Sequence, residues 1–112
     1  MDYKKSEAKE YAREHLVGVW AANLTPFDDD LRIDEKAYRE NLDHWIKDLQ
    51  LGGLFIAGKQ AEFFSMSIPE RKRLMEMSVE AAQAAGDRGG IGRCGIITSC
   101  SDTNLDVVLD LA

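Results

Sequence analysis

The sequence predicts an α/β protein in which strands and helices alternate around a parallel sheet. Short apolar runs recur along the chain, and they are continuous rather than alternating, as in strands buried on both faces. Each run is followed by a segment whose apolar residues repeat at spacings of three and four, which is typical of an amphipathic helix. Because units of roughly 35 to 40 residues suit parallel crossover connections, we expect three consecutive right-handed strand–helix units.

The composition excludes several classes of function. The chain has 112 residues and a formal net charge of −6, with 45% hydrophobic and 30% charged residues, the balance of a soluble globular protein. An excess of acid argues against binding to nucleic acid or a membrane surface, because phosphate binding needs clustered Lys and Arg. No apolar run approaches the ~20 residues that span a bilayer. The charged N-terminus, MDYKKSEAKEYAREH, lacks an apolar signal core and predicts a cytoplasmic protein.

A helix and then a strand open the chain. Residues 2–15 are rich in Lys, Glu and Ala, with Tyr3 and Tyr11 as the main apolar residues, and predict a short, weakly amphipathic helix. The run from Val17 to Leu24 predicts a buried strand. Thr25-Pro26 ends that strand, because proline cannot donate to a β-ladder.

A helix and a second strand follow. Asp34 is suited to cap the helix and Gly52-Gly53 to end it. The strand runs from Leu54 to Ala57 and stops at Gly58. The expected apolar face of the helix comprises Tyr38, Leu42, Trp45, Ile46 and Leu49.

The next helix has the clearest start in the chain. Ser67 and Glu70 form an S-x-x-E capping box with Pro69 in the first turn, and Gly86 ends the helix. The apolar face of this helix comprises Leu74, Met77, Ala81 and Ala85.

The third strand is expected from Ile91 to Thr98, with Gly92 and Gly95 indicating close approach of neighbouring backbone. Ser101 or Asp102 is expected to cap a last helix, with Leu105, Val108, Leu109 and Ala112 at helical spacing.

No residue cluster predicts a metal site or a disulfide. Asp28 to Asp30 are consecutive, so they cannot all point at one ion, and they read as a solvated turn. Cys94 and Cys100 lie too close along one strand to bridge unless the strand folds back, and two thiols alone make a poor metal site. His15 and His44 have no partner at ligand spacing. Small buried thiols are the favoured interpretation, with Cys100 lining a pocket as the alternative.

The turn after the second strand is the main candidate site. In barrels of alternating strands and helices, chemistry is placed in the turns that follow the strands. This turn holds Lys59, Gln60 and Glu62, which can contact an anionic substrate.

These segments together resemble a known family. The strand ending in Thr25-Pro26-Phe27 and the G-x-x-x-E-F-x-S-x-S-x-x-E-R segment from Gly58 to Arg71 are similar to the N-terminal part of the dihydrodipicolinate synthase/N-acetylneuraminate lyase family. The resemblance implies a (β/α)8 TIM barrel, of which this chain supplies the first three strand–helix units, preceded by a short N-terminal helix. It divides the chain into a helical extension, 1–16, and an incomplete barrel domain, 17–112.

The resemblance also implies a function. Members of this family are Schiff-base lyases and aldolases acting on pyruvate or a related 2-oxo acid, and they need no metal or organic cofactor. A lysine on the sixth strand forms the imine, which acts as an electron sink, and a tyrosine on the fifth strand relays protons. Both strands lie beyond residue 112, so no catalytic residue is assigned in this chain. Family members are commonly homodimers or homotetramers.

One departure from the family concerns the candidate turn. The usual Gly-Thr-Thr-Gly-Glu reads Gly58-Lys59-Gln60-Ala61-Glu62 here. One hypothesis is that Lys59 and Gln60 recognise the acid group of a larger 2-oxo acid or an aromatic-ring fission product, since charge-assisted hydrogen bonds are strong. The alternatives are a solvent-facing loop without a binding role and, with less support, Lys59 as the nucleophile itself.

Other residues are assigned less specific roles. Thr25 is a candidate substrate-binding residue at the barrel mouth, or a strand-end residue that bonds local backbone. Glu62 is expected to brace the turn. One of Thr98, Ser99 and Cys100 is expected to line the pocket.

Two alternative functions remain open beside the lyase. One is a catalytically inert fragment or non-enzymatic remnant of the barrel, and the other is a dehydratase, deaminase or hydratase-aldolase. A small doubly wound domain that binds a phosphorylated ligand is disfavoured, because no G-x-G-x-x-G or P-loop pattern follows any strand.

Overall fold

The chain alternates between strands and helices as the sequence predicts. A computed structural model describes residues 3–86 and 93–112. A 3-10 turn, Lys5–Glu7, leads into the first helix, and a π-helical turn, His44–Asp48, extends the second. The regular elements are α1 (Ala8–His15), β1 (Trp20–Ala22), α2 (Glu35–Asp43), β2 (Gly53–Ile56), α3 (Ile68–Ala85), β3 (Gly95–Thr98) and α4 (Leu105–Leu111).

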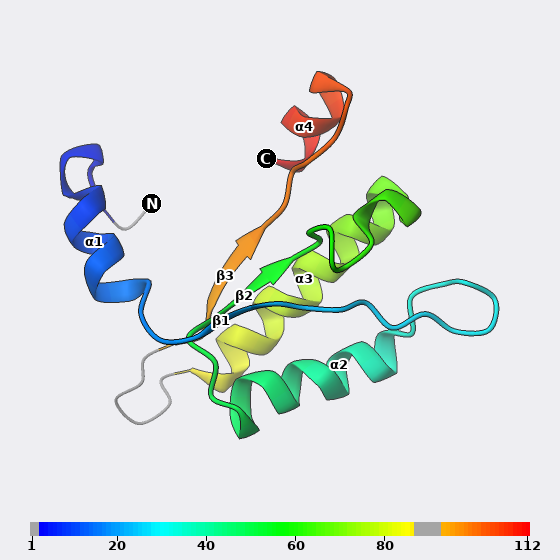
Figure 1. The fold of residues 1–112 in the computed structure, drawn as a ribbon, viewed down its shortest axis with the longest axis horizontal. Helices are drawn as coiled ribbons and strands as arrows, with labels where there is room; N and C mark the ends of the chain where they lie inside the picture. The colour runs from blue at the N-terminus through cyan, green and yellow to red at the C-terminus, as the bar shows by residue number, and fades with distance from the viewer. Residues whose placement is uncertain (1–2, 87–92) are drawn as a thin grey trace.

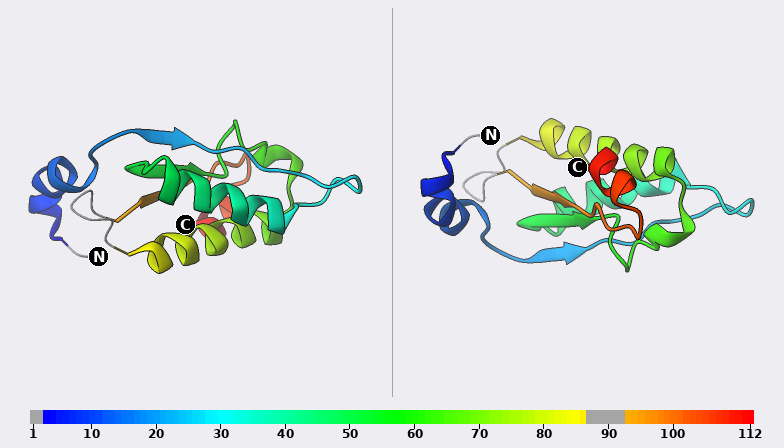
Figure 2. Two further views of the ribbon diagram at one scale, coloured as in Figure 1. Left: turned by 90° about the horizontal axis from the view of Figure 1, so that it is seen from below. Right: turned by 90° about the horizontal axis from the view of Figure 1, so that it is seen from above.

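The three strands form one parallel sheet in the order β1-β2-β3. Each strand therefore lies beside its predecessor in the sequence. Helices α2 and α3 pack together against the same face of this sheet (Figures 1 and 2). A doubly wound sheet places helices on both faces, whereas stepwise order with helices on one face is the arrangement of a barrel wall.

The hydrophobic core lies between the sheet and these two helices. Its fully buried side chains come from both layers: Tyr38, Leu42, Leu54, Ile56, Leu74 and Met77. Side chains alternate between the faces of a strand, so Ala21, Leu54 and Ile96, which are paired in register, all point to this core. The predicted helix faces that contribute Leu74, Met77, Tyr38 and Leu42 are confirmed.

The opposite face of the sheet is covered by the indole of Trp20. Trp20, Gly53 and Gly95 lie side by side in register. A Cβ atom added at either glycine would overlap the indole ring. The expectation for Gly95 was close approach of neighbouring backbone, but the approaching group is an aromatic ring. Gly92 lies outside the described residues.

The strands are shorter than predicted. β1 has three residues, because Gly18 adopts φ +80° before it. The ends of the apolar run are not buried, since Val19 is 69% exposed and Leu24 is 63% exposed. β2 ends at Ile56, because Ala57 takes a left-handed conformation with φ +53°. The predicted start of the third strand, residues 91–92, lies outside the described residues.

Two helix boundaries differ from the prediction. The second helix turns at Gln50, with φ +50°, rather than at Gly52-Gly53, and Gly53 belongs to β2. Leu49 is 53% exposed rather than on the buried face. The capping box of Ser67 and Glu70 and the end of α3 at Gly86 are confirmed.

The cap of α4 is Asn104, whose side chain accepts from the Asp106 N–H at 2.9 Å. The prediction that Ser101 or Asp102 caps this helix is wrong. Asp102 Oδ1 accepts from the Asn104 N–H at 3.0 Å just before the helix, while Asp102 Oδ2 and the Ser101 carbonyl accept from Arg71.

Helix α1 lies apart from the sheet and the other helices (Figures 1 and 2). Tyr11 of this helix stacks on Tyr3, which precedes the helix, with ring centroids 4.3 Å apart, and on His15 with ring centroids 3.9 Å apart. None of the helices in the described ranges is long and apolar enough to cross a membrane.

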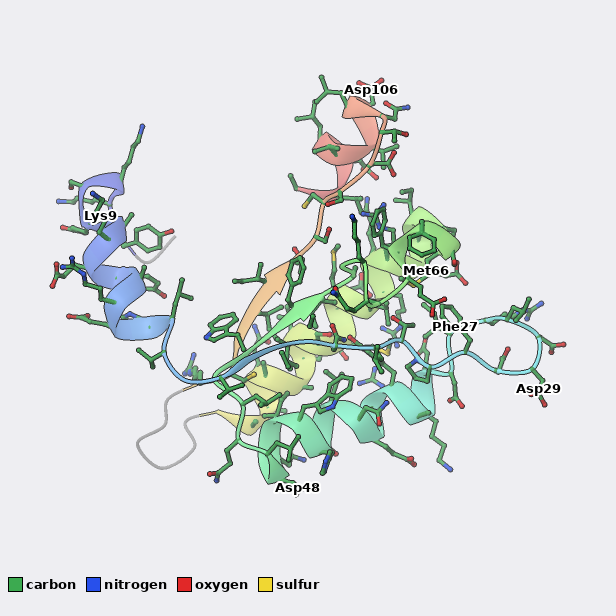
Figure 3. All side chains as sticks on the ribbon, in the orientation of Figure 1. Lys9, Phe27, Asp29, Asp48, Met66 and Asp106 are labelled. Carbon is green, nitrogen blue, oxygen red and sulfur yellow. The ribbon has the colours of Figure 1, made fainter. Side chains whose placement is uncertain are left out.

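A loop carrying Asp28 to Asp30 projects from the body, with Asp29 labelled near its tip in Figure 3. The Asp28 carboxylate accepts from the backbone N–H groups of Asp30 and Arg32, both at 2.9 Å. This confirms a solvated turn. Leu31 is 82% exposed and has φ +61°, a conformation that costs a residue with a Cβ atom about 1–2 kcal/mol.

We therefore expect Leu31→Gly to raise the free energy of unfolding by about 0.5–1 kcal/mol, after allowing for glycine's greater freedom in the unfolded chain. Urea titration followed by circular dichroism measures this change. Leu31→Ala is the matched control, because it removes the same exposed apolar group but keeps the Cβ atom. An equal gain in both variants would show that surface hydrophobicity, rather than the backbone, is responsible.

Candidate functional site

The loops that follow the three strands lie at one edge of the sheet. Parallel strands bring their carboxyl ends together, and in barrels of this kind that edge carries the chemistry. The loop after β1 contains Thr25, the loop after β2 contains Lys59 and Gln60, and the loop after β3 contains Ser99 to Asp102. The fold therefore brings the sequence-predicted site residues to one end of the molecule.

Thr25 connects the first two loops. Its Oγ1 donates to the carbonyl oxygen of Ala61 at 2.9 Å. This bond spans from the end of β1 to the turn after β2, so the Thr25 hydroxyl fixes the position of that turn.

The turn itself is compact and conformationally strained. The Gly58 carbonyl accepts from the Ala61 N–H at 3.1 Å, and the Lys59 carbonyl accepts from the Glu62 N–H at 3.0 Å. Glu62, with φ +58°, and Ala57 both have left-handed backbones. Such residues persist only where the surroundings enforce them, and they gather at ligand-binding sites.

Lys59 and Gln60 occupy the tip of this turn and are exposed. Neither side chain makes a hydrogen bond or ion pair with any residue in the described ranges. Ala61, by contrast, is 1% exposed and packs into the interior. The Lys59 ammonium and the Gln60 amide are thus exposed on a turn that is anchored to the interior through Ala61.

Arg71 is a residue that the sequence reasoning missed. Its side chain is 2% exposed, and its guanidinium donates to the Ser101 carbonyl at 2.8 Å, the Ser99 carbonyl at 3.3 Å and Asp102 Oδ2 at 3.3 Å. Its Cζ lies 5.0 Å from the centre of the Phe63 ring, within the range of a cation–π interaction. The signals in the sequence were its place directly after a capping-box glutamate and at the end of the family-like segment from Gly58 to Arg71.

Arg71 therefore links the loop after β2 to the loop after β3. A cleft of about 440 Å³ lies between them, lined by Phe63, Phe64, Met66, Ile68, Arg71, Ser101, Asp102 and Thr103. Figure 3 labels Met66 at the entry to α3.

The residues at the end of β3 are engaged locally. Ser99 is 5% exposed, and its hydroxyl donates to Ser101 Oγ at 2.9 Å. The Cys100 thiol donates to the Leu111 carbonyl at 3.4 Å, and both cysteines are free thiols. Whether Thr98, Ser99 or Cys100 contacts a ligand stays a prediction.

A buried chain of hydrogen bonds lies beneath the first loop. Asn23 Nδ2 donates to the Tyr38 hydroxyl at 2.7 Å, and Tyr38 contacts Ser78 Oγ at 2.9 Å. The Ser78 hydroxyl donates to the Leu74 carbonyl at 2.7 Å, so the Tyr38 hydroxyl must donate to Ser78. Burial raises the pKa of Tyr38 above its ordinary value, which keeps the phenol protonated. These hydrogen bonds join the loop after β1 to α2 and α3 beneath the candidate site.

The start of α3 is also electrostatically stabilised. Hydrogen bonds from the backbone N–H and the hydroxyl of Ser67, both 2.8 Å, lower the pKa of Glu70. Glu70 is therefore a fixed anion at the N-terminus of the helix, where negative charge is favourable. Within the described part of the chain, no three His, Cys, Asp or Glu side chains are grouped to hold a metal ion.

The comparison with family models identifies the relationship. Residues 15–87 match the model of the Dihydrodipicolinate synthetase family. The chain belongs to this family. Its resemblance to the dihydrodipicolinate synthase/N-acetylneuraminate lyase group is thereby confirmed.

Curated members of the family show which enzymes are similar. The chain is 32% identical over 97 residues to the N-acetylneuraminate lyase of Clostridium perfringens, covering 87% of this chain and 31% of the lyase. It is 38% identical over 74 residues to a probable 5-dehydro-4-deoxyglucarate dehydratase of Rhodococcus opacus, covering 66% of this chain and 24% of the dehydratase. The chain thus spans about a third or less of the length of these relatives.

Solved structures confirm the fold. The N-acetylneuraminate lyase of Fusobacterium nucleatum superposes with a TM-score of 0.72 at 26% identity, covering 84% of this chain and 30% of the lyase. The N-acetylneuraminate lyase of Mycoplasma synoviae gives a TM-score of 0.76 at 22% identity, covering 88% and 31%. The prediction of an α/β chain that corresponds to part of a TIM barrel is confirmed. The domain boundary at residue 16 and the binding roles of Thr25, Lys59 and Gln60 stay predictions.

The buried hydrogen-bond chain provides a test of the framework. Tyr38→Phe leaves Asn23 Nδ2 without its acceptor, and an unsatisfied buried donor costs about 1–3 kcal/mol. We expect a loss of this size in the free energy of unfolding, measured by urea titration. Tyr11→Phe, at a half-exposed tyrosine on α1, is the control and should change little. A neutral Tyr38→Phe would mean that Asn23 finds another partner.

Proposed function

We propose that this chain forms part of a Schiff-base lyase that acts on pyruvate or a related 2-oxo acid, and that it contributes substrate-binding residues rather than the nucleophile. The observation that supports this most strongly is that Lys59 and Gln60, which have no side-chain partner among the described residues, lie on a strained turn at the strand ends of a family member. The matched relatives are lyases and dehydratases. An inert remnant of the barrel would not need such a turn.

The proposed role of the turn is to hold the carboxylate of the substrate. The Lys59 ammonium supplies a full positive charge and the Gln60 amide a second donor. Thr25 acts indirectly, because its hydroxyl donates to the Ala61 carbonyl and so positions the turn. With the acid group fixed, the neighbouring keto carbon is presented to an amine that another part of the barrel supplies.

The reaction follows from imine chemistry. An amine that condenses with the keto carbon withdraws electrons, so the adjacent carbon can lose a proton or a bonded partner. Cleavage, dehydration and deamination share this intermediate. A dehydratase acting on a larger 2-oxo acid is the second candidate, favoured by the 38% identity to a dehydratase. Assembly into homodimers or homotetramers is part of the same proposal.

The position of the nucleophile can be tested on the chain itself. Treatment with pyruvate and borohydride, followed by intact-mass measurement, should leave residues 1–112 unmodified, because the imine-forming amine is expected outside them. A stable pyruvate adduct that disappears in Lys59→Met would contradict this and assign the nucleophile to Lys59. Lys47→Met, which removes an exposed lysine paired with Asp43, is the matched control.

The binding role of the turn requires the active barrel. In an assembled enzyme that contains this chain, Lys59→Met should weaken 2-oxo acid binding about tenfold or more, because a hydrogen bond to a charged group contributes about 1.5–3 kcal/mol. We expect KM to rise more than kcat falls. Lys47→Met should leave both constants unchanged. Unaltered KM in Lys59→Met would eliminate the recognition role and leave the turn as a solvent-facing loop.

A further inference from the structure

Arg71 carries a positive charge into the interior at the start of α3. Its side chain is 2% exposed, and its guanidinium donates to the carbonyl oxygens of Ser99 and Ser101 and to Asp102 Oδ2. Its Nε is buried and has no hydrogen-bond acceptor among the described residues. An unsatisfied buried donor costs free energy, and apolar side chains of similar volume often replace a buried ion pair without loss of stability. Stability alone therefore does not account for an arginine at this position.

The guanidinium also contacts the segment that carries Lys59. Its Cζ lies 5.0 Å from the centre of the Phe63 ring, a distance at which a cation is attracted to the face of the ring. The Phe63 N–H donates to the Gly58 carbonyl at 3.5 Å, across the turn. The Phe63 ring therefore connects Arg71 to the C-terminal end of the turn.

The strained residue of the turn lies between two anchored neighbours. Glu62 has φ +58°, and a left-handed residue with a Cβ atom persists only where its surroundings enforce it. The preceding residue, Ala61, is held by the Thr25 hydroxyl through its carbonyl oxygen. The following residue, Phe63, is held by Arg71 through its ring. Both contacts are needed to fix the turn on either side of Glu62.

The same guanidinium reaches the loop after β3. Asp102 Oδ2 accepts from Arg71, while Asp102 Oδ1 accepts from the Asn104 N–H at 3.0 Å. The planar guanidinium has fixed donor directions, so it sets the position of this loop relative to the ring of Phe63. A lysine supplies the charge but not this arrangement of donors.

We propose that Arg71 is a positioning residue for substrate recognition. Its guanidinium, acting through Phe63, holds the turn in the conformation in which Lys59 and Gln60 bind the substrate carboxylate. Arg71 itself stays bonded to the loop after β3. This inference rests on the proposed binding role of the turn, so its test is designed to distinguish failure of the one from failure of the other.

Pyruvate is the probe, and the enzyme is an assembled barrel that contains this chain. Borohydride trapping followed by intact-mass measurement gives the half-saturating pyruvate concentration and the maximum trapped fraction. Arg71→Lys should raise the half-saturating concentration about fivefold or more, because it keeps the charge but loses the fork of donors that positions the turn. The maximum trapped fraction should stay unchanged, since the imine-forming amine is not displaced.

A second variant and a control accompany Arg71→Lys. Phe63→Leu removes the ring but leaves Arg71 in place, and it should raise the half-saturating concentration in the same way. Arg73→Lys is the matched control, because Arg73 lies on the same helix but is ion-paired with Glu35 of α2 at 2.9 Å. It should leave pyruvate binding unchanged.

Coupling to Lys59 distinguishes positioning from a general effect on stability. In Lys59→Met the ammonium is already lost, so adding Arg71→Lys should raise the half-saturating concentration by about twofold at most. The N–H groups of Ala61 and Glu62 are hydrogen-bonded within the turn. Their hydrogen exchange should be faster in Arg71→Lys and unchanged in Arg73→Lys, and this readout does not depend on the reaction.

Three results would overturn the inference. One is an unchanged half-saturating concentration in Phe63→Leu or in a folded Arg71→Lys. Another is an equal effect of Arg71→Lys with and without Lys59→Met, because Arg71 would then act independently of the turn. The third is unchanged hydrogen exchange at the turn in Arg71→Lys. Unaltered pyruvate binding in Lys59→Met alone would refute the proposed binding role, and the inference with it, so that failure is identified by a different variant.

Discussion

A parallel sheet has to be covered on both faces, and this requirement organises the whole molecule. Helices α2 and α3 cover one face and create the core around Leu54 and Ile56. The other face is covered in part by a single indole, that of Trp20, which lies across two glycines. The partly exposed Ile97, at 43%, marks where this cover ends. The face of the sheet toward the helices is therefore fully covered, and the face that corresponds to the interior of a barrel is only partly covered.

The site end of the molecule is fixed by two polar contacts of different strength. The hydroxyl of Thr25 joins the first loop to the second, and the buried guanidinium of Arg71 joins the second to the third. Breaking the Arg71 contact would leave a charge uncompensated in the interior, which is far more costly than losing one neutral hydrogen bond. The backbone of the turn is held by the Thr25 hydroxyl and by its own hydrogen bonds, while Lys59 and Gln60 at its tip are exposed. A substrate-binding turn requires this combination of a positioned backbone and exposed side chains.

The sequence predicted those features that depend on local pattern. Alternation of strands and helices, the burial of Leu74 and Met77, and the Ser67 capping box follow from spacing and side-chain chemistry within a few residues. The family resemblance located the Gly58–Glu62 turn. The features that sequence reasoning missed depend on contacts distant in the chain. Arg71, for example, engages the Ser101 carbonyl and Asp102 Oδ2, which lie about thirty positions later in the sequence.

The same reason explains the shorter strands and the unexpected turns. The run from Val17 to Leu24 was predicted to be one strand because it is apolar throughout. Only Trp20 to Ala22 pair with β2. Glycine was expected where the chain turns, yet Gln50, Ala57 and Glu62 adopt positive φ. The glycines at 53 and 95 are needed for a different reason, the ring of Trp20. Glycine in a sequence does not reveal which of these two reasons applies.

The contact of Trp20 with Gly53 and Gly95 also has an evolutionary consequence. Three positions far apart in the sequence fill one layer, and the volume of that layer is supplied almost entirely by one of them. A larger residue at position 53 or 95 is compatible only with a smaller one at position 20, so the three sites are free to change together but not singly. Relatives that carry a small side chain at position 20 should therefore carry bulkier residues on the two neighbouring strands. The identity of one aromatic residue on β1 thus constrains what β2 and β3 can encode.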